Sequence, residues 1–501
     1  MKSKLSTVAL SSIALLAASP SVWATQFQGF QAGNLVISTV TNQAPGFQNS
    51  GLDTASSITL MQFALGAGGT SLTANGSLVL PQVASGKNSA ISGEYGSASE
   101  GILQRSVNGQ YLTIMGYGVN AAAFNAAAAN NGSTPSAYGT MALGQTNSVA
   151  TGSNIFVPRV VGLINASGNV DTTTALTGVF NGNNPRSAAT VDGSSFYISG
   201  QSGNKTDNTQ GVFYAGKGST TATPIDTSTD TRVISLVNNG KGNMLYVSRD
   251  YNPPGGGGQN FTNVSSLTNT TGGLPTNSTG LITTHITPPA SANSVGGNNG
   301  SITVNTGNQN GVNNSRLGKF VYLSPEQYYF AAANVLYVAD SGAPKNGSAG
   351  AAALGEGGLQ KWVNSKADGS GTWTLAYDLV NGLNLVNNAT ANSNTPTAAG
   401  VTGLFGLTGV VVGGQAELFA TSYGLNELSP SFLYEITDTL SNTTIASASN
   451  EKFTTLISSA ALNGADIRGV AFSPVPEPES FALFALGLAG LAFVRRKAFK
   501  R

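Results

Sequence analysis

The two ends of the chain carry strand patterns that have no partner nearby in the sequence. Residues 466–474 read DIRGVAFSP, the pattern of a first strand in a unit that has no strand after it. Residues 34–39 read NLVIST, the pattern of a second strand with none before it. Residues 58–65 and 77–81 can supply the third and fourth strands. A sheet shared by both ends would close a ring of sheets and leave no open strand edge.

Between these ends, one unit recurs: a strand, a turn with Gly or Asn, and a second, more apolar strand. The pairs Asn108-Gly109 and Asp192-Gly193 predict hairpin turns of type I′, which need positive φ. A further pair of candidate strands follows the unit, as at 159–164 with 175–180. The units occupy residues 101–118, 186–200, 232–250, 319–342 and 403–424.

Four strands in each repeat are typical of propeller blades. Five units and one shared blade therefore predict an all-β, six-bladed propeller over residues 25–473. Residues 252–300 are rich in Gly and Asn and are expected to form one extended loop, while 121–129 could be a short helix or a loop. The alternatives are a parallel β-helix adhesin and stacked β-sandwich domains.

Three strand motifs carry a resemblance to known propellers. LYVSRD at 245–250, LYVADSG at 336–342 and IRGVAFSP at 467–474 resemble six-bladed propellers of the NHL/SMP-30-like type. In such propellers, ligands of a central metal come from strand ends, so the resemblance implies Asp250 and Asp340 as candidates for a Ca²⁺ site. Aspartates that cap turns beside Ser and Gly are the ordinary alternative, and we favour it.

The N-terminus has the features of a secretory signal. Lys2 and Lys4 precede a mostly apolar run at 8–18, and the small residues Val22 and Ala24 follow. This pattern predicts a signal peptide over residues 1–24, cut by signal peptidase between Ala24 and Thr25.

The C-terminus has a short apolar run between a proline-rich spacer and a basic cluster. Val475-Pro476-Glu477-Pro478 precedes an apolar run at 481–494, and Arg495-Arg496 follows. As a helix this run would span roughly 21 Å, less than the ~30 Å of a bilayer core. We therefore expect a short transmembrane helix in residues 474–501, with its basic end in the cytoplasm. Such a short helix is expected to anchor the chain only until a protease removes it, and the alternative is a permanent membrane anchor.

This tail resembles the PEP-CTERM sorting signal, on the strength of Pro476-Glu477-Pro478, the apolar run and Arg495-Arg496. The resemblance covers only about the last 28 residues. It implies processing by an exosortase, a membrane protease of Gram-negative, exopolysaccharide-producing bacteria. The expected route is export, a transient anchor in the inner membrane, and then the cell surface or the extracellular biofilm matrix.

Composition narrows the possible partners. Charged residues make up 9% of the chain, against about 25% in ordinary soluble domains, and there is no cysteine. Without its terminal segments the chain has 16 basic and 20 acidic residues, a net charge near −4, which argues against a nucleic-acid partner. His285 is the only histidine, which excludes a zinc site of the usual His/Cys type. We expect it to be an exposed strand or loop residue.

Two further sets of residues are predicted to be structural. Trp362 and Trp373 lie on neighbouring candidate strands and are expected to pack between blades, with a sugar-stacking platform as the alternative. Arg186, Arg232 and Arg468 begin three units at similar places, which predicts a role in binding carbonyls or carboxylates between blades.

These patterns favour a non-enzymatic surface or matrix propeller that binds exopolysaccharide or a surface partner. No catalytic residues are predicted, and Ca²⁺ is the one cofactor left open. The alternatives are a secreted propeller enzyme, such as a Ca²⁺-dependent hydrolase or lyase, and a purely structural coat protein.

Overall fold

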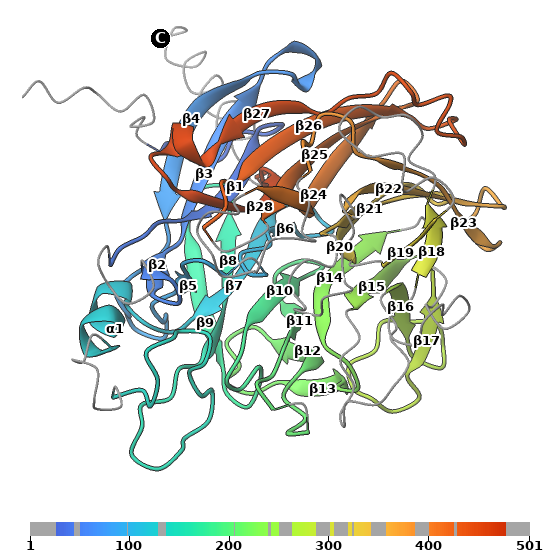
Figure 1. The fold of residues 1–501 in the computed structure, drawn as a ribbon. Coiled ribbons are helices and arrows are strands. Elements are labelled where there is room, and N and C mark those ends of the chain that lie inside the picture. The colour runs from blue at the N-terminus through green and yellow to red at the C-terminus, as the bar shows by residue number, and fades with distance from the viewer. Residues whose placement is uncertain are drawn as a thin grey trace, which may run out of the picture.

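All but two of the described strands form six twisted sheets around a common axis, a six-bladed β-propeller (Figure 1). The structure is a computed structural model. It describes residues 27–44, 51–97, 99–128, 137–204, 206–238, 242–249, 263–286, 301–304, 319–322, 325–341, 357–385, 400–424 and 428–476. The prediction of an all-β, six-bladed propeller is confirmed.

We number the blades by the order of their innermost strands. Blade 1 contains β2 (Ala55–Ser57), β5 (Ser92–Glu94), β6 (Gln104–Arg105), β7 (Tyr111–Tyr117), β8 (Arg159–Asn165) and β9 (Val170–Leu176). Blade 2 contains β10 (Pro185–Ala189), β11 (Ser195–Gly200), β12 (Gly211–Gly216) and β13 (Thr223–Asp226). Blade 3 contains β14 (Thr231–Asn238), β15 (Asn243–Arg249), β16 (Asn263–Thr268) and β17 (Ile282–His285).

The remaining blades each have four strands in the described part of the chain. Blade 4 contains β20 (Pro325–Ala332), β21 (Val335–Asp340), β22 (Gly358–Asn364) and β23 (Trp373–Leu379). Blade 5 contains β24 (Val401–Val412), β25 (Gln415–Gly424), β26 (Phe432–Thr439) and β27 (Thr454–Ser458). Blade 6 contains β28 (Asp466–Phe472), β1 (Leu35–Val40), β3 (Thr59–Leu65) and β4 (Leu72–Val79).

Blade 6 closes the ring with strands from both ends of the chain, as predicted. β28 is its innermost strand and pairs antiparallel with β1, so that Val36 lies opposite Ala471. β1 pairs on its other side with β3, and β3 pairs with β4. Hydrophobic clusters fill the spaces between neighbouring blades; the cluster with Leu35, Phe419 and Val470, for example, joins blades 5 and 6.

The elements outside the blades are short. α1 (Ala121–Ala128) is a helix and not a loop. At its start, the side chain of Asn120 accepts a hydrogen bond from the Ala123 amide (2.8 Å). η2 (Ala67–Gly69) and η5 (Ser459–Leu462) are 3-10 turns. β18 (Ser301–Val304) pairs with β19 (Lys319–Tyr322) in a separate two-stranded sheet.

Three local predictions were wrong. The stretch 252–300 is not one loop, because β16 and β17 lie in it as the two outer strands of blade 3. Both strands are rich in Ser, Thr and Asn, which are typical of loops. The strand expected at 175–180 ends at Leu176. At the first hairpin only Gly109 has positive φ (77°), and its amide donates to the Ser106 carbonyl (2.9 Å), so the turn is not of type I′.

The innermost strands begin at one face of the propeller, which we call the front face. The starts of β14 and β20 meet there, because Arg232 forms an ion pair with Glu326. The hairpin turns that follow the innermost strands lie at the opposite, back face. Two of these turns are joined there, since the Asn108 amide donates to the Val191 carbonyl (3.0 Å).

Candidate functional site

A bulge recurs near the start of the innermost strand in five blades. In each case the strand register shifts against the neighbouring strand, and the bulged segment carries a polar side chain. A bulge redirects the side chain of the extra residue. We call these five residues the polar ring: Arg186, Arg232, Glu326, Thr402 and Arg468.

The polar ring ties neighbouring blades together at the front face. Arg186 in blade 2 binds Asp230, just before blade 3 (2.6 Å), and Arg232 in blade 3 binds Glu326 in blade 4. The Thr402 hydroxyl in blade 5 donates to the Ser341 carbonyl, which follows blade 4 (3.0 Å). All of these side chains are buried. Buried ion pairs with further hydrogen bonds are costly to break, so the ring holds the blades in place.

Blade 1 differs from the others at this level. Two short strands, β5 and β6, fill the place beside β7 that one innermost strand takes in the other blades, and β2 pairs with the other side of β5. The chain between them carries Glu100, and β5 ends with Glu94. The Glu94 amide donates to the Glu100 carboxylate (3.3 Å). The interruption of this strand therefore places two carboxyl groups together beside blade 6.

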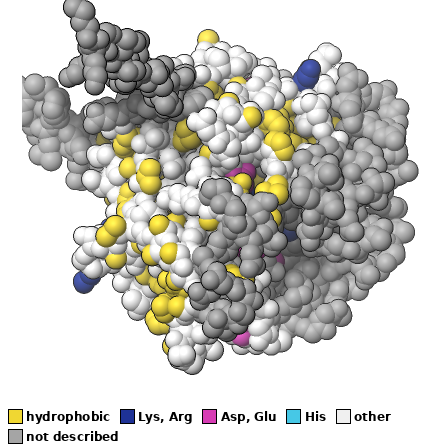
Figure 2. Space-filling view, turned by 60° about the vertical axis from the view of Figure 1, so that its left-hand side comes forward, with side chains coloured by type: hydrophobic (Ala, Val, Ile, Leu, Met, Phe, Trp, Pro, Cys, Tyr) yellow, Lys and Arg dark blue, Asp and Glu magenta, His cyan; other side chains and the backbone are white. Residues whose placement is uncertain are grey.

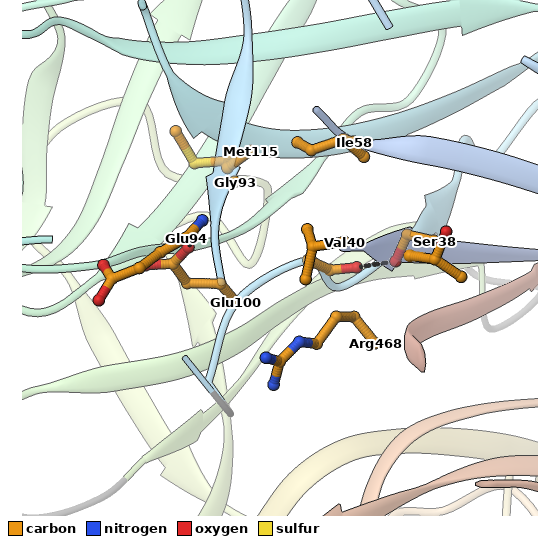
Figure 3. Close-up of a pocket in the computed structure, with 10 residues that line it drawn as sticks. Ser38, Val40, Ile58, Gly93, Glu94, Glu100, Met115 and Arg468 are labelled. Carbon is orange, nitrogen blue, oxygen red and sulfur yellow. Dashed lines mark hydrogen bonds between the residues drawn. The ribbon is translucent and has the colours of Figure 1, made fainter. Parts of the chain in front are cut away.

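A pocket opens between blades 6 and 1 at this interruption. Its cavity volume is about 10 Å³, room for about one water molecule, and roughly 270 Å³ of space lies in and around it when the open solvent at its mouth is included. Figure 3 shows Glu94 and Glu100 side by side, with Arg468 of β28 near them and the apolar side chains of Val40, Ile58 and Met115 on other sides. Ser38, Thr39, Gly93 and Gly101 complete the lining. The residues that line the pocket thus combine two carboxyls, one guanidinium and two hydroxyls with an apolar wall.

Burial controls the charge of the Glu100 carboxyl. It raises the pKa of Glu100 to about 7, although the Tyr117 hydroxyl donates to the carboxylate and lowers this pKa in part. Beneath Tyr117, the Arg159 guanidinium lies 4.8 Å from the ring centre and donates to the carbonyls of Thr146 (2.7 Å) and Phe180 (2.9 Å). Glu100 is therefore a carboxyl that exchanges its proton near neutral pH.

The raised pKa of Glu100 predicts a pH-dependent stability. In the unfolded chain this carboxyl titrates near 4.5, so its protonated form favours the folded state below that pH, and the contribution is lost as pH rises through about 7. We expect the wild-type free energy of unfolding to fall by about 2–3 kcal/mol more than that of Glu100→Gln between pH 4.5 and 8. Urea unfolding of both proteins across this range measures the difference, and parallel curves would contradict it.

The two candidate metal positions are not equivalent in strand register. Asp340 is buried at the end of β21, opposite Pro325, and its carboxylate accepts a hydrogen bond from Gln360 (2.5 Å). Gly200 and Gly424 hold the corresponding place in blades 2 and 5, and in blade 3 this place belongs to Arg249, because Arg249 lies opposite Thr231. Asp250 lies outside the described residues. No group of three His, Asp or Glu side chains suited to a metal occurs among the residues that were described.

The other singled-out residues lie away from the pocket. His285 is exposed on the outer strand β17, as expected, with its Nδ1 3.0 Å from the Ser265 hydroxyl. Trp362 and Trp373 are buried in the cluster that joins blades 3 and 4, which confirms the packing prediction. The predicted inter-blade role of Arg186 and Arg232 is confirmed, while Arg468 binds Asp466 of its own strand (2.6 Å) beside the pocket.

The start of the C-terminal tail is held on the back face. The Val475 amide donates to the Gly109 carbonyl (2.8 Å), so the chain stays on the propeller two residues beyond the predicted domain end at 473. Pro476 is exposed. Glu477, Pro478, Arg495 and Arg496, the apolar run and the cleavage pair Ala24 and Thr25 lie outside the described residues. Within the described ranges, no helix is long and apolar enough to cross a membrane.

Sequence reasoning missed Glu94 and Glu100. Both lie in SGEYGSASEG at 92–101, a stretch of Gly and Ser that reads as an ordinary loop. The usable signal was the unit at 101–118, whose first strand is shorter than in the other units. A shortened innermost strand leaves space at the level of the polar ring, and the acidic residues just before the strand are candidates to occupy that space.

Comparison with known proteins gives one family match and several distant structural likenesses. The PEP-CTERM protein-sorting motif matches residues 474–497. The periplasmic gluconolactonase of Pseudomonas aeruginosa is 11% identical, with a TM-score of 0.39, and the match covers 88% of this chain and 99% of that one. The GH74 enzyme of Niastella koreensis is 10% identical, with a TM-score of 0.35, over 86% of this chain and 46% of that one. No curated protein sequence is significantly similar.

The sorting motif and the fold together place the chain in a broad class. The motif implies export, a stage at which the C-terminus is anchored in a membrane, and processing by an exosortase. The described residues that precede it form the propeller. The chain is an exported protein that carries a PEP-CTERM sorting motif behind a six-bladed propeller body.

Proposed function

We propose that this protein works at the cell surface or in the extracellular matrix, where it binds exopolysaccharide through the pocket between blades 6 and 1. The observation that carries the proposal is the convergence of Glu94, Glu100 and Arg468 on one opening, in a protein with few charges elsewhere. On the face drawn in Figure 2, the described residues are mostly uncharged, with only scattered charged groups. Such a surface gives little electrostatic attraction, so recognition depends on local hydrogen bonds.

The chemistry of the pocket suits a hydroxylated ligand. Carboxylates accept hydrogen bonds from hydroxyl groups, a guanidinium donates them, and a carboxyl that is partly protonated near pH 7 can do either. Val40, Ile58 and Met115 give the pocket an apolar wall, which strengthens hydrogen bonds made beside it. The cavity volume of about 10 Å³ has room for about one water molecule, so we expect a hydroxyl group of a chain end or side branch, and not a whole sugar ring, to enter it.

Processing at both ends belongs to the same proposal. Signal peptidase would remove residues 1–24, and an exosortase would cut within the tail at 474–501, releasing or transferring the body from Thr25 onward. Because the Val475 amide is hydrogen-bonded to the body, we place the cut beyond it, at or after the exposed Pro476. Mass spectrometry of the protein from the envelope would give both ends.

Retention on the exopolysaccharide of the producing organism tests the binding function. The body ending at Pro476 should be retarded in gels that contain this polymer, and the variant with Glu94→Gln and Glu100→Gln should migrate freely. Asp192→Asn, a change at an exposed aspartate of the blade 2 hairpin, is the control and should behave like wild type. Equal retardation of the double variant, or none of the wild type, would contradict the proposal.

A secreted acid–base enzyme is the second candidate, and the Glu94–Glu100 pair favours it. Two adjacent carboxyls of which one keeps its proton near neutral pH are a common arrangement for proton transfer to and from sugars. If the polymer is shortened on incubation, and Glu100→Gln abolishes shortening without loss of retention, the pocket is catalytic. Metal bound after exhaustive dialysis would point instead to Ca²⁺ chemistry. A structural coat protein would show neither retention nor turnover.

A further inference from the structure

The hairpin of β24 and β25 is the longest in the propeller's described part and has an apolar tip. β24 has 12 residues and β25 has 10, whereas the described innermost strands of the other blades have at most 8. At the tip, the exposed fractions of Val410, Val411 and Val412 are 36%, 38% and 62%. The turn is made by two glycines with positive φ, Gly413 and Gly414. We call residues 410–412 the valine tip.

The valine tip lies on the back face, the face from which the C-terminal tail departs. β24 is an innermost strand, so its end and the turn that follows lie at the back. The turn of η2 lies beside this hairpin, because a Cβ on Gly69 would meet the side chain of Glu417 on β25. The turn of η2 follows the end of β3. The end of β3 and the end of β28 lie at the same edge of blade 6, because Leu35 is paired with Phe63 of β3 and with Phe472 of β28.

The tip has the chemistry of a segment that enters the surface layer of a bilayer. No charged residue occurs between 408 and 416. The backbone is paired up to the turn, with Val410 opposite Glu417 and Val412 opposite Gln415, so insertion would leave few unpaired backbone groups. In water, an exposed apolar hairpin invites aggregation, so its presence on the anchored side suggests that it is covered there.

We propose that the valine tip rests in the interfacial layer of the membrane while the C-terminal tail anchors the chain. The sorting motif brings a membrane anchor to the back face, at Val475 on the turn of Gly109. With the anchor held, a weak apolar contact nearby becomes effectively intramolecular. Two contacts would hold the back face on the bilayer and direct the front-face pocket away from it. This inference concerns the anchored stage and does not depend on the ligand.

The absence of cysteine makes a direct test possible. Val411→Cys is labelled with an environment-sensitive fluorophore in the full chain, which is reconstituted into vesicles of neutral and anionic phospholipids that contain quencher lipids. Val83→Cys is the matched control, because Val83 is 74% exposed and belongs to the front face. It follows β4, whose end lies level with the start of β28. We expect a blue shift and loss of emission for the label at 411 and neither change at 83.

Three outcomes would overturn the proposal. The first is an absence of quenching at 411, which would mean that the tip does not reach the bilayer. The second is a concentration-dependent shift at 411 without lipid, which would assign the tip to a second copy of the chain. The third is equal quenching at 411 and 83, which would mean that the propeller has no fixed orientation. Replacing Val410 and Val412 by Ser beside the labelled site should reduce the blue shift while circular dichroism shows an unchanged fold.

Discussion

Ending the chain after Ala465 should abolish folding of the propeller, whereas ending it after Pro476 should leave folding intact. The shorter chain lacks β28, the innermost strand of blade 6, and the longer one lacks only the sorting tail. The eleven residues that separate these two ends are a small part of the chain. They should nevertheless decide whether a ring can close.

The expected loss follows from what β28 contributes. Ile467 and Val470 are almost fully buried, and full burial of two such side chains contributes about 3–6 kcal/mol, against a typical total stability of about 5–15 kcal/mol. The Arg468 carbonyl accepts a bond from Thr421 in blade 5 (2.6 Å), and the Gly469 amide donates to Ser38 in β1 (2.8 Å). Without β28, the Thr421 hydroxyl loses its acceptor, the Ser38 hydroxyl loses this donor, and one edge of β1 is left unpaired.

Expression of both truncated chains, followed by circular dichroism and limited proteolysis, measures the difference. The chain ending at Pro476 should unfold in one cooperative transition and resist protease. The chain ending at Ala465 should aggregate or be degraded. Adding a peptide of residues 466–476 should restore part of the protection if the loss lies in strand pairing. A shorter chain that is as resistant as the longer one would show that blade 6 does not need β28.

The sequence was sufficient to predict the closure of the ring because its signals were local and complementary. DIRGVAFSP and NLVIST each lacked a neighbour, and a strand without a partner must find one elsewhere. The same reasoning failed for β16 and β17, whose Asn, Ser and Thr residues look like loop in a single sequence. Those strands form because β16 can pair with β15 in blade 3 and β17 with β16. This pairing is a tertiary effect that the intrinsic strand propensity of the residues does not include.

The pocket could not be predicted for a related reason. Glu94 and Glu100 become neighbours only because the innermost strand of blade 1 is interrupted. The composition of residues 92–101 does not predict this interruption. The arginines were easier, since Arg186, Arg232 and Arg468 recur at one place in the repeat. Their recurrence indicated a shared structural role, but it could not show that Arg468 also lines the pocket, because this depends on the join between the last and first blades.

Replacing Lys361 by Met should be the most destabilising single side-chain change considered, at a cost of about 3–5 kcal/mol, because it leaves a buried carboxylate without its cation. Lys361 on β22 and Asp438 on β26 are both fully buried, and their charged groups lie 2.7 Å apart between blades 4 and 5. The Lys361 ammonium also donates to the Thr439 carbonyl (2.8 Å) and to the Tyr377 hydroxyl (3.0 Å).

The surroundings of Asp438 explain why it needs that cation. The hydroxyls of Tyr337 and Tyr377 both donate to its carboxylate, the second at 2.5 Å. Burial raises the pKa of Glu451 to about 9, and its bond to Asp438 adds to this effect, so Glu451 keeps its proton at neutral pH and donates it to Asp438. All three of these neighbours donate hydrogen bonds to the Asp438 carboxylate. Once Lys361 is gone, this buried group loses its ion-pair partner.

Urea unfolding at pH 7 measures the cost, with Lys366→Met as the matched control. Lys366 is exposed after the same strand, so its loss should change the free energy of unfolding by no more than about 0.5 kcal/mol. Combining Lys361→Met with Asp438→Asn removes both charges and should recover part of the lost stability, because the cost lies in the unbalanced charge rather than in the space that Lys361 fills. A double variant as unstable as the sum of its single changes would mean that the pair acts through packing alone.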